Sequence, residues 1–411
     1  MISLSRALHS RTLHLTLLSI LLAAGVTLRC LPSHAVHNSP DELNYAHQST
    51  LVLQQGRAAF PILVADFRAH PFLPPPTRAG FLYLLASVIS LTGHADVSAG
   101  LALSAFASIL ALLLFARLAW RFFTPAVALS ALTLYAASPL ALATASHAWQ
   151  ESTVEALTLL LLLSAAELLR SNFAWPWSLL FALTGAACIT IKESAAFAFL
   201  FFTTALLLPL FTRPRTPRHT VIFCALIVSA IALPILWLAS LLGLDALLHF
   251  HAMAANFLAT SAYSLQHEAG SPLDLLHALF VISPLAALCF PIGVFALFRK
   301  PAAPQHFLLT ATALFVTLIT AATVIVPHHI NFRYSAAAFA PAYLVAAFGF
   351  CWAVNSIAGR LQPAHKDFLF ASASIAVLLF ALGDFATYQQ RFNSAQLQDL
   401  SIRMVLTGIN R

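Results

Sequence analysis

Long apolar segments, separated by short polar connections, recur along the whole of this chain. Each is close to the length of about 20 residues that a helix needs to cross the hydrocarbon core of a bilayer. A helix satisfies its own backbone polar groups, which lipid cannot do, whereas a membrane β-barrel would show short alternating segments. The pattern therefore predicts an all-α polytopic integral membrane protein with about eleven transmembrane helices. The expected spans are residues 12–31, 99–119, 125–145, 152–169, 176–192, 195–212, 220–242, 274–298, 306–326, 335–355 and 367–387.

Composition agrees with this class and argues against two other readings. The 411 residues are 60% hydrophobic and only 9% charged, with a mean hydropathy of +0.86. The net charge of +7 does not indicate a nucleic-acid partner, because the cations lie at the ends of apolar segments. In that position they indicate how the segments are oriented in the membrane. The cysteines are expected to form neither a disulfide nor a zinc site, since they show no CxxC or metal spacing. They are Cys30, Cys188, Cys224, Cys289 and Cys351.

The positions of arginine and lysine set the expected orientation. With the N-terminus in the cytoplasm, every cytoplasmic loop carries positive charge, as the positive-inside rule requires. The first span is then uncleaved; a signal peptide cleaved near residues 33–35 is the alternative. The tail after Tyr388 is expected to lie outside, and residues 1–411 are expected to form one domain without a soluble C-terminal domain. The cytoplasmic cations are Arg6, Arg11, Arg117, Arg121, Arg170, Arg213, Arg215, Arg218, Arg299, Lys300, Arg360 and Lys366.

One apolar segment, Gly80–Thr92, is too short for a span. If it crossed the membrane, every later loop would change sides and the arginines would face outward. We therefore expect a helix that lies on the outer membrane surface. The first outer loop accordingly runs over residues 32–98, and a second outer loop runs over residues 243–273.

Acidic and basic residues gather on the outer face of this topology, and the inner loops carry no comparable set. A cavity that holds carboxylates and cations suits an anionic lipid-linked substrate. Cations can hold a phosphate, and a carboxylate can deprotonate an attacking acceptor. The members are Asp41, Glu42, His47, His147, Glu151, Lys192, Glu193, His329 and Arg333.

Several of these residues also have a simpler structural interpretation, which spacing alone favours. Lys192 and Arg333 lie near span ends, where long cationic side chains usually snorkel to the headgroups. His147 and Glu151 would share a helix face if a helix continues through them, but a polar turn between two spans is the simpler alternative. Adjacent histidines at 328 and 329 do not predict a metal site without a carboxylate at ligand spacing.

The stretch "SPDE" has an interpretation as a helix start. Ser39 at the N-cap, Pro40 at the first helical position and Glu42 at the third form a capping box. Asp41 would favour the positive end of the helix dipole. Capping accounts for Glu42 but leaves Asp41 without a structural role.

Five segments resemble motifs of the GT-C glycosyltransferases, in the protein O-mannosyltransferase and aminoarabinose-transferase group (glycosyltransferase family 39-like). The resemblance covers most of the chain, and the motifs fall in the family's order on the outer face. It implies the GT-C fold in a bacterial inner membrane, with the active site at the periplasmic face. The segments are "DELNY", "HPFLPPPTRAGFLYLLASVISLTGHADVSAG", "ASPLALATASHAWQES", "IKESAAF" and "NFRYSAAAFAPAYLVAAFG".

The resemblance also implies a reaction: transfer of a sugar from a polyprenyl-phosphate donor to an acceptor glycan, lipid or protein, with inversion of the anomeric centre. Asp41 would be the general base, and Glu42 would orient acceptor or sugar. Lys192 and Arg333 would hold the departing lipid phosphate, which needs cations rather than a strong acid. No cofactor is expected, and metal dependence is left open. Further candidates for substrate binding are Tyr45, His147, Glu151, Glu193, His329 and Tyr334.

The chain departs from the family pattern at "HPFLPPP", where the family usually has Lys-Pro-Pro-Leu. His70 or Arg78 is expected to replace the missing lysine. Acceptor choice is left open, because larger members carry a soluble outer domain. Two other functions are also left open: a transporter or flippase for a lipid-linked sugar, which needs no acid at the acceptor position, and a non-catalytic membrane protein with this fold.

Overall fold

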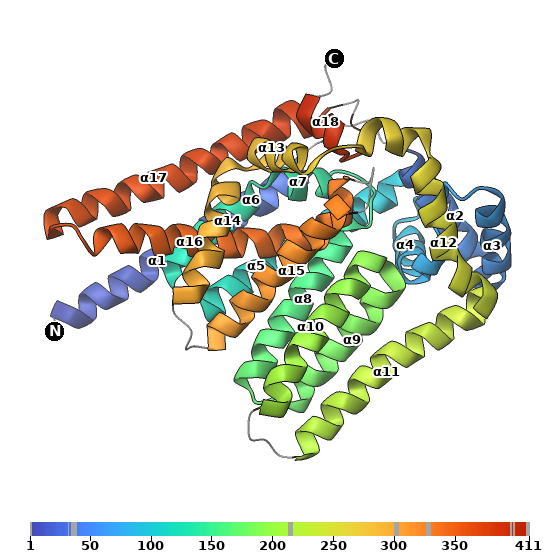
Figure 1. Ribbon diagram of the computed structural model, residues 1–411, viewed down its shortest axis with the longest axis horizontal. Coiled ribbons are helices and arrows are strands. Elements are labelled where there is room, and N and C mark those ends of the chain that lie inside the picture. Colours follow the sequence, from blue (N-terminus) through green and yellow to red (C-terminus); the bar gives the residue numbers. More distant parts are fainter. Residues whose placement is uncertain are drawn as a thin grey trace.

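The chain folds almost entirely into helices, and Figure 1 shows long helices through the body of the molecule with the short α2, α3 and α4 gathered at one end. Within the residues described, β-pairing is limited to a single bridge between Asn331 and Ser401. The expected all-α membrane fold class is confirmed. The computed structural model describes residues 2–31, 33, 39–212, 217–299, 304–325, 330–394, 397 and 399–407.

The helices are α1 (Ile2–Cys30), α2 (Pro40–Gln55), α3 (Ala59–Ala69), α4 (Ala79–Thr92), α5 (Val97–Phe122), α6 (Pro125–Ala136), α7 (Pro139–Ala145), α8 (Glu151–Arg170), α9 (Trp175–Ile191), α10 (Glu193–Thr212), α11 (Pro217–Leu242), α12 (Leu244–Thr260), α13 (Pro272–Ile282), α14 (Pro284–Arg299), α15 (Pro304–Ile325), α16 (Phe339–Ala358), α17 (Pro363–Thr387) and α18 (Ile402–Thr407). Short 3₁₀ or π turns are η1 (Gly56–Ala58), η2 (Pro76–Arg78), η3 (Ser264–Glu268), η4 (Phe332–Ala338) and η5 (Tyr388–Phe392).

Seven of the described helices are long and apolar enough to cross a membrane, or up to nine segments if each bent pair counts as one span. The bent pairs are α6 with α7, at 53°, and α13 with α14, at 113°. Two further expected spans fall on shorter apolar helices, α9 and α15. All eleven expected segments are therefore mainly helical, while the number of crossings stays a prediction.

A proline explains both bends. Pro139 follows Ser138, and Pro284 follows Ser283. A proline disfavours helical geometry in the residue before it, and both serines lie outside the helical region, with ψ of 119° and 88°. The chain therefore leaves one helix at each serine and starts another at the proline, where the missing N–H costs no helical hydrogen bond.

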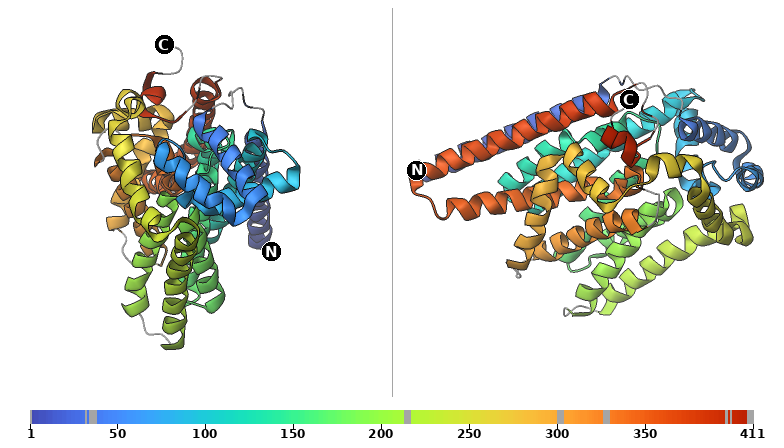
Figure 2. Two further views of the ribbon diagram at one scale, coloured as in Figure 1. Left: turned by 90° about the vertical axis from the view of Figure 1, so that its right-hand side faces the viewer. Right: turned by 45° about the horizontal axis from the view of Figure 1, so that its top comes forward.

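The two expected outer loops contain helices of their own. The segment 32–98 holds α2, α3 and α4, and α4 matches the expected helix over Gly80–Thr92, ending at Gly93 with a left-handed φ of 73°. The segment 243–273 is mostly α12, which packs on α3 through Phe67 and Phe250, with ring centroids 4.8 Å apart. Figure 2 shows α2–α4 from the side, turned toward the viewer in its left panel.

Close packing of α14 on α16 depends on two glycines. A Cβ added at Gly349 would overlap the backbone oxygen of Cys289 and the backbone nitrogen of Gly293. Small residues allow helix backbones to approach closely in a membrane. Gly349→Ala should therefore lower the free energy of unfolding by about 1–3 kcal/mol, seen as a lower melting temperature of the purified protein in detergent.

Gly383 in α17 provides the matched control, because a Cβ there meets no atom within 4 Å. Gly383→Ala should leave the melting temperature unchanged or raise it slightly, since alanine has the higher helix propensity. Equal melting temperatures for the two variants would show that the α14–α16 contact does not limit stability.

Candidate active site

The two carboxylates at the start of α2 have different partners. Glu42 closes the predicted capping box: Ser39 Oγ accepts from the Glu42 backbone N–H at 3.4 Å, and the Ser39 backbone N–H donates to Glu42 Oε2 at 3.3 Å. Glu42 Oε1 accepts from the Ala148 backbone N–H at 2.9 Å and lies 3.2 Å from Nδ1 of His147. Glu42 thus ties α2 to the connection between α7 and α8, and its side chain is fully buried.

Asp41 lies at the open edge of the site, where 33% of its side chain is exposed. Its Oδ2 is 2.7 Å from Nη1 of Arg333, whose side chain is only 10% exposed. Helix capping leaves Asp41 without a structural role, but in the structure it pairs with Arg333 of η4 (Phe332–Ala338). A charge-assisted pair of this length fixes the carboxylate in one direction.

Glu151, the first residue of α8, joins the two predicted phosphate-binding cations. Its Oε1 lies 2.6 Å from Lys192 Nζ and 3.1 Å from Arg333 Nε. Lys192 has extended backbone between α9 and α10, and its side chain is 4% exposed. The interpretation that Lys192 and Arg333 snorkel to the headgroups is therefore wrong, because both side chains turn inward to a buried carboxylate. We call Asp41, Glu151, Lys192, Arg333 and Asp399 the acid–base cluster.

Asp399 was missed by sequence reasoning, and it enters the cluster from the segment that precedes α18. Its Oδ1 is 3.5 Å from Arg333 Nη1, and its Oδ2 accepts from Asn331 Nδ2 at 2.7 Å and from the Tyr263 hydroxyl at 3.1 Å. Burial raises the pKa of the Asp399 carboxyl above its usual value, although Arg333 acts in the opposite direction. Asn331 Nδ2 also donates to Glu268 at 2.8 Å. A backbone hydrogen bond joins the segment that carries Asp399 to the start of η4, because the Phe332 N–H donates to the Leu400 oxygen at 2.9 Å.

Aromatic rings cover the two cations. The Arg333 guanidinium carbon lies 4.5 Å from the centroid of the Trp149 ring, and Lys192 Nζ lies 5.9 Å from that of Tyr334. Trp149 stacks on His147 at 4.0 Å and donates from Nε1 to Ser39 Oγ at 3.4 Å. Cation–π contact strengthens where water is excluded, so the rings orient the cations without neutralising them.

A second ion-pair group lies beside the acid–base cluster. Arg78 donates to the Tyr45 hydroxyl at 2.6 Å and to Glu193 Oε2 at 3.1 Å. Burial raises the pKa of the Tyr45 hydroxyl, so the phenol stays protonated at neutral pH. Glu193 thus has Arg78 as its ion-pair partner, whereas its neighbour Lys192 pairs with Glu151. Of the two residues proposed to replace the family's lysine, Arg78 lies among the other candidates, whereas His70 is exposed at the end of α3.

The remaining predicted residues divide into three cases. His147 and Glu151 do not share a helix face, because α7 ends at Ala145 and α8 begins only at Glu151. His147 lies in the turn between these two helices, whereas Glu151 begins α8, and the two side chains reach separate partners. His47 is exposed on α2. His329 lies outside the described residues.

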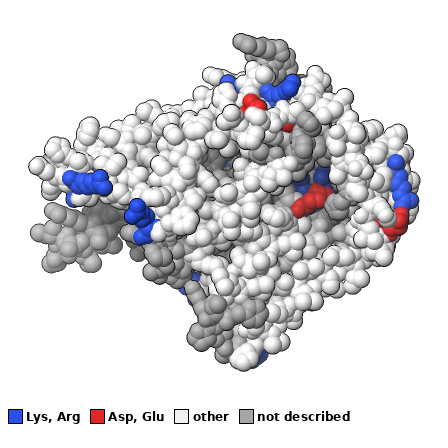
Figure 3. All heavy atoms as spheres, viewed as in Figure 1, with Lys and Arg blue, Asp and Glu red and all other residues white. Residues whose placement is uncertain are grey.

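The described residues contain no group of three or more His, Cys, Asp or Glu side chains arranged to hold a metal ion. Most of the surface in Figure 3 is uncharged, as expected for a face in contact with lipid. A recess to the right of its centre holds adjoining acidic and basic side chains. Buried cations of this kind can hold an anionic group, and the partly exposed Asp41 can exchange a proton with a molecule that enters.

The cap of α2 offers a test of how the site is held. Ser39→Ala removes the hydroxyl that accepts from Glu42 and from Trp149, so the free energy of unfolding should fall by about 1 kcal/mol. Substrate turnover should fall as well, because α2 carries Asp41. Ser271, which forms the same kind of capping box for α13, is the matched control. Ser271→Ala should cost similar stability in a melting experiment and leave turnover unchanged; equal losses of turnover would contradict this role of Ser39.

Comparisons with known proteins connect this geometry to a fold. The fold is similar to that of ArnT from Cupriavidus metallidurans in its apo state and bound to undecaprenyl phosphate, each with a TM-score of 0.55 and 13% identity over 97% of this chain and 77% of that chain. It is also similar to the Archaeoglobus fulgidus oligosaccharyltransferase tethered with an acceptor peptide, with a TM-score of 0.54 and 14% identity over 93% of this chain and 55% of that chain. Both are GT-C glycosyltransferases, so the GT-C fold expected from the motifs is confirmed. No sequence-family description and no curated protein matches the chain.

Proposed function

We propose that the chain is an inverting glycosyltransferase that moves a sugar from a polyprenyl-phosphate donor to an acceptor at the outer face of the membrane. The observation that carries this proposal is the acid–base cluster, in which the partly exposed Asp41 contacts the buried Arg333. The GT-C fold supports the general kind of activity. ArnT bound to undecaprenyl phosphate supports a polyprenyl-linked donor. The distribution of positive charge supports the outer face.

Lys192 and Arg333 would hold the donor phosphate. In the structure both cations are engaged by Glu151, and Arg333 is also engaged by Asp41. An arriving phosphate competes with Asp41 for Arg333, because both anions seek the same guanidinium. Donor binding therefore releases the Asp41 carboxylate at the time when a base is needed, and Glu151 keeps both cations in place.

The reaction follows from this arrangement. The acceptor hydroxyl oxygen attacks the anomeric carbon from the face opposite the phosphate, and the bond between that carbon and the phosphate oxygen breaks. The electron pair leaves with the phosphate, where Lys192 and Arg333 stabilise the charge. Asp41 takes the proton of the acceptor hydroxyl as general base.

The acceptor and the sugar can be identified by mass spectrometry of glycolipids and glycoproteins from cells with and without the gene. In cells without the gene, the proposal predicts that one glycoconjugate lacks a single sugar and that the unmodified acceptor accumulates. Identical profiles from the two strains, under conditions where the protein is expressed, would contradict it.

A further inference from the structure

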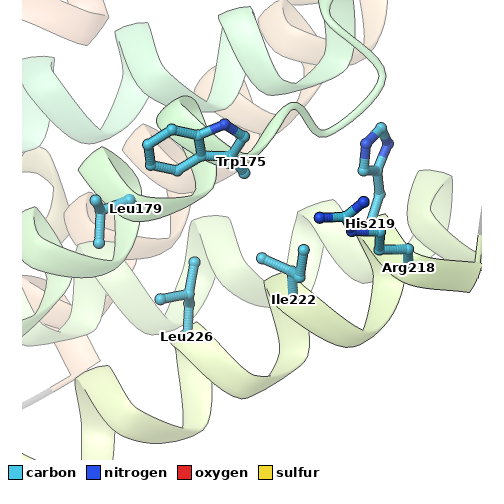
Figure 4. A pocket seen from close by; sticks show the side chains of 6 residues that line it. All are labelled: Trp175, Leu179, Arg218, His219, Ile222 and Leu226. Carbon is cyan, nitrogen blue, oxygen red and sulfur yellow. The ribbon is translucent and has the colours of Figure 1, made fainter.

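A second region with polar groups at one end lies along the contact between α9 and α11. A cavity of about 490 Å³ opens there, with Trp175 and Leu179 from α9 facing α11 (Figure 4). Arg218 and His219 lie at one end of the α11 side. The full lining is Trp175, Leu179, Arg218, His219, Ile222 and Leu226.

An apolar groove of about 470 Å³ continues this cavity along the same two helices. Leu179 and Leu226 line both spaces, and the groove extends to Thr190 and Trp237 near the other ends of the helices. Alanines in α9, such as Ala186, leave room between the helices. Cavity and groove together form one elongated space, polar at one end and apolar along its length.

The polar end lies far from the acid–base cluster. Trp175 is the first residue of α9, and Lys192 follows its last residue. A helix of 17 residues is roughly 25 Å long, which approaches the thickness of the hydrocarbon core of a bilayer. A phosphate bound at Arg218 therefore cannot be the phosphate that Lys192 and Arg333 would hold.

The groups at this end suit a lipid headgroup. Arg218 is exposed, and a guanidinium binds phosphate oxygens in pairs. Among the described residues, Nδ1 of His219 is buried without a hydrogen-bond partner. Trp175 is 60% exposed, and tryptophan favours the membrane interface. The side chains of Val221 and Leu233 on α11 are 66% and 65% exposed. The groove therefore lies beside an exposed apolar surface that suits contact with lipid chains.

We propose that this space binds an anionic phospholipid of the bilayer, with its phosphate at Arg218 and His219 and one acyl chain in the groove between α9 and α11. Basic pockets between transmembrane helices bind anionic headgroups, and the apolar groove accounts for the chain. The site is separate from the proposed donor site. A donor whose polyprenyl chain filled the groove would carry its phosphate at the opposite end, where Arg218 cannot reach it.

Native mass spectrometry of the full-length protein in detergent, titrated with phosphatidylglycerol or phosphatidylcholine, tests this proposal. One molecule of phosphatidylglycerol should bind more tightly than phosphatidylcholine. Arg218→Gln should weaken phosphatidylglycerol binding about fivefold, since one cation near the surface contributes about that factor. Arg360→Gln, at an exposed turn after α16, is the matched control and should have no effect. Equal affinity for the two lipids, or wild-type binding by Arg218→Gln, would overturn the proposal.

Two further measurements separate the occupants. Ala186→Phe narrows the groove and should weaken binding of both phospholipids, because it excludes the acyl chain rather than the headgroup. Polyprenyl phosphate, added at the same concentration, should leave phosphatidylglycerol bound. Displacement of phosphatidylglycerol by polyprenyl phosphate would assign the groove to the donor chain and refute the phospholipid site, whatever the outcome for sugar transfer.

Discussion

Asp41→Asn should greatly slow sugar transfer while the protein still binds the polyprenyl-phosphate donor. Asparagine has nearly the shape of aspartate but cannot accept a proton, so the variant loses the proposed base and, with it, the charge that pairs with Arg333. A positioned general base contributes about 10²–10⁴-fold to rate, and the loss should lie in that range. The measurement is turnover of a radiolabelled polyprenyl-phospho-sugar by protein in liposomes, beside a donor-binding titration.

Donor affinity makes this prediction specific. Asp41 occupies Arg333 at 2.7 Å in the structure, so its charge competes with the donor phosphate. Asp41→Asn should therefore bind donor as tightly as the wild type or more tightly. Asp245→Asn is the matched control, since Asp245 pairs with Arg68 on an exposed surface, and it should change neither quantity. A flippase would behave differently, because its Asp41→Asn variant should continue to move lipid-linked sugar across the bilayer.

Arg333→Gln should have the second large effect, on both stability and activity. The guanidinium lies among three carboxylates, those of Asp41, Glu151 and Asp399. Removing one partner of a buried ion pair costs about 3–5 kcal/mol, because it leaves charge in a poorly solvated place. The melting temperature should fall, and donor binding should weaken together with transfer, since a phosphate ligand is lost.

Two other variants give this prediction its controls. Arg333→Lys keeps the charge but lacks the planar fork that reaches Asp41 and Glu151 together, so it should recover stability before activity. Arg121→Gln removes a half-exposed arginine whose partner Glu167 also pairs with Arg170, and it should be nearly neutral. If Arg333→Gln kept wild-type donor affinity in folded protein, Arg333 would not be a phosphate ligand.

Local signals in the sequence predicted much of what surrounds this site. The start of α2 is predicted by Ser39, Pro40 and Glu42, and the capping box is present in the structure. The expected topology has Asp41, Lys192 and Arg333 on one face, and in the structure Arg333 pairs with Asp41 and shares Glu151 with Lys192. Serine followed by proline at 138 and 283 also marked breaks within two expected spans, a signal that the length of the apolar segments concealed.

The pairing within the site could not be read from sequence. Glu151 contacts Lys192, which follows α9, and Arg333, which lies in η4, and only the packing of α8 against α9 and η4 brings them together. The side chain of Asp399 contacts Arg333, and backbone hydrogen bonds join the segment before α18 to residues 330–332. Irregular segments of this kind carry no periodic pattern in the sequence. The position of Lys192 at a span end favours snorkelling, since span ends usually lie near headgroups. In the structure the side chain turns inward instead, because the buried carboxylate of Glu151 lies within reach.

Incubation of the reconstituted protein with a polyprenyl-phospho-sugar and an extract of candidate acceptors tests the central claim most directly. Mass spectrometry follows the free polyprenyl phosphate that is released and the sugar-bearing product that appears. The proposed mechanism predicts that both form in equal amounts, that the product has the inverted anomeric configuration, and that Asp41→Asn forms both about 10²–10⁴-fold more slowly. Donor that stays intact with every acceptor fraction, in folded protein that binds it, would contradict the assignment of this cluster to glycosyl transfer.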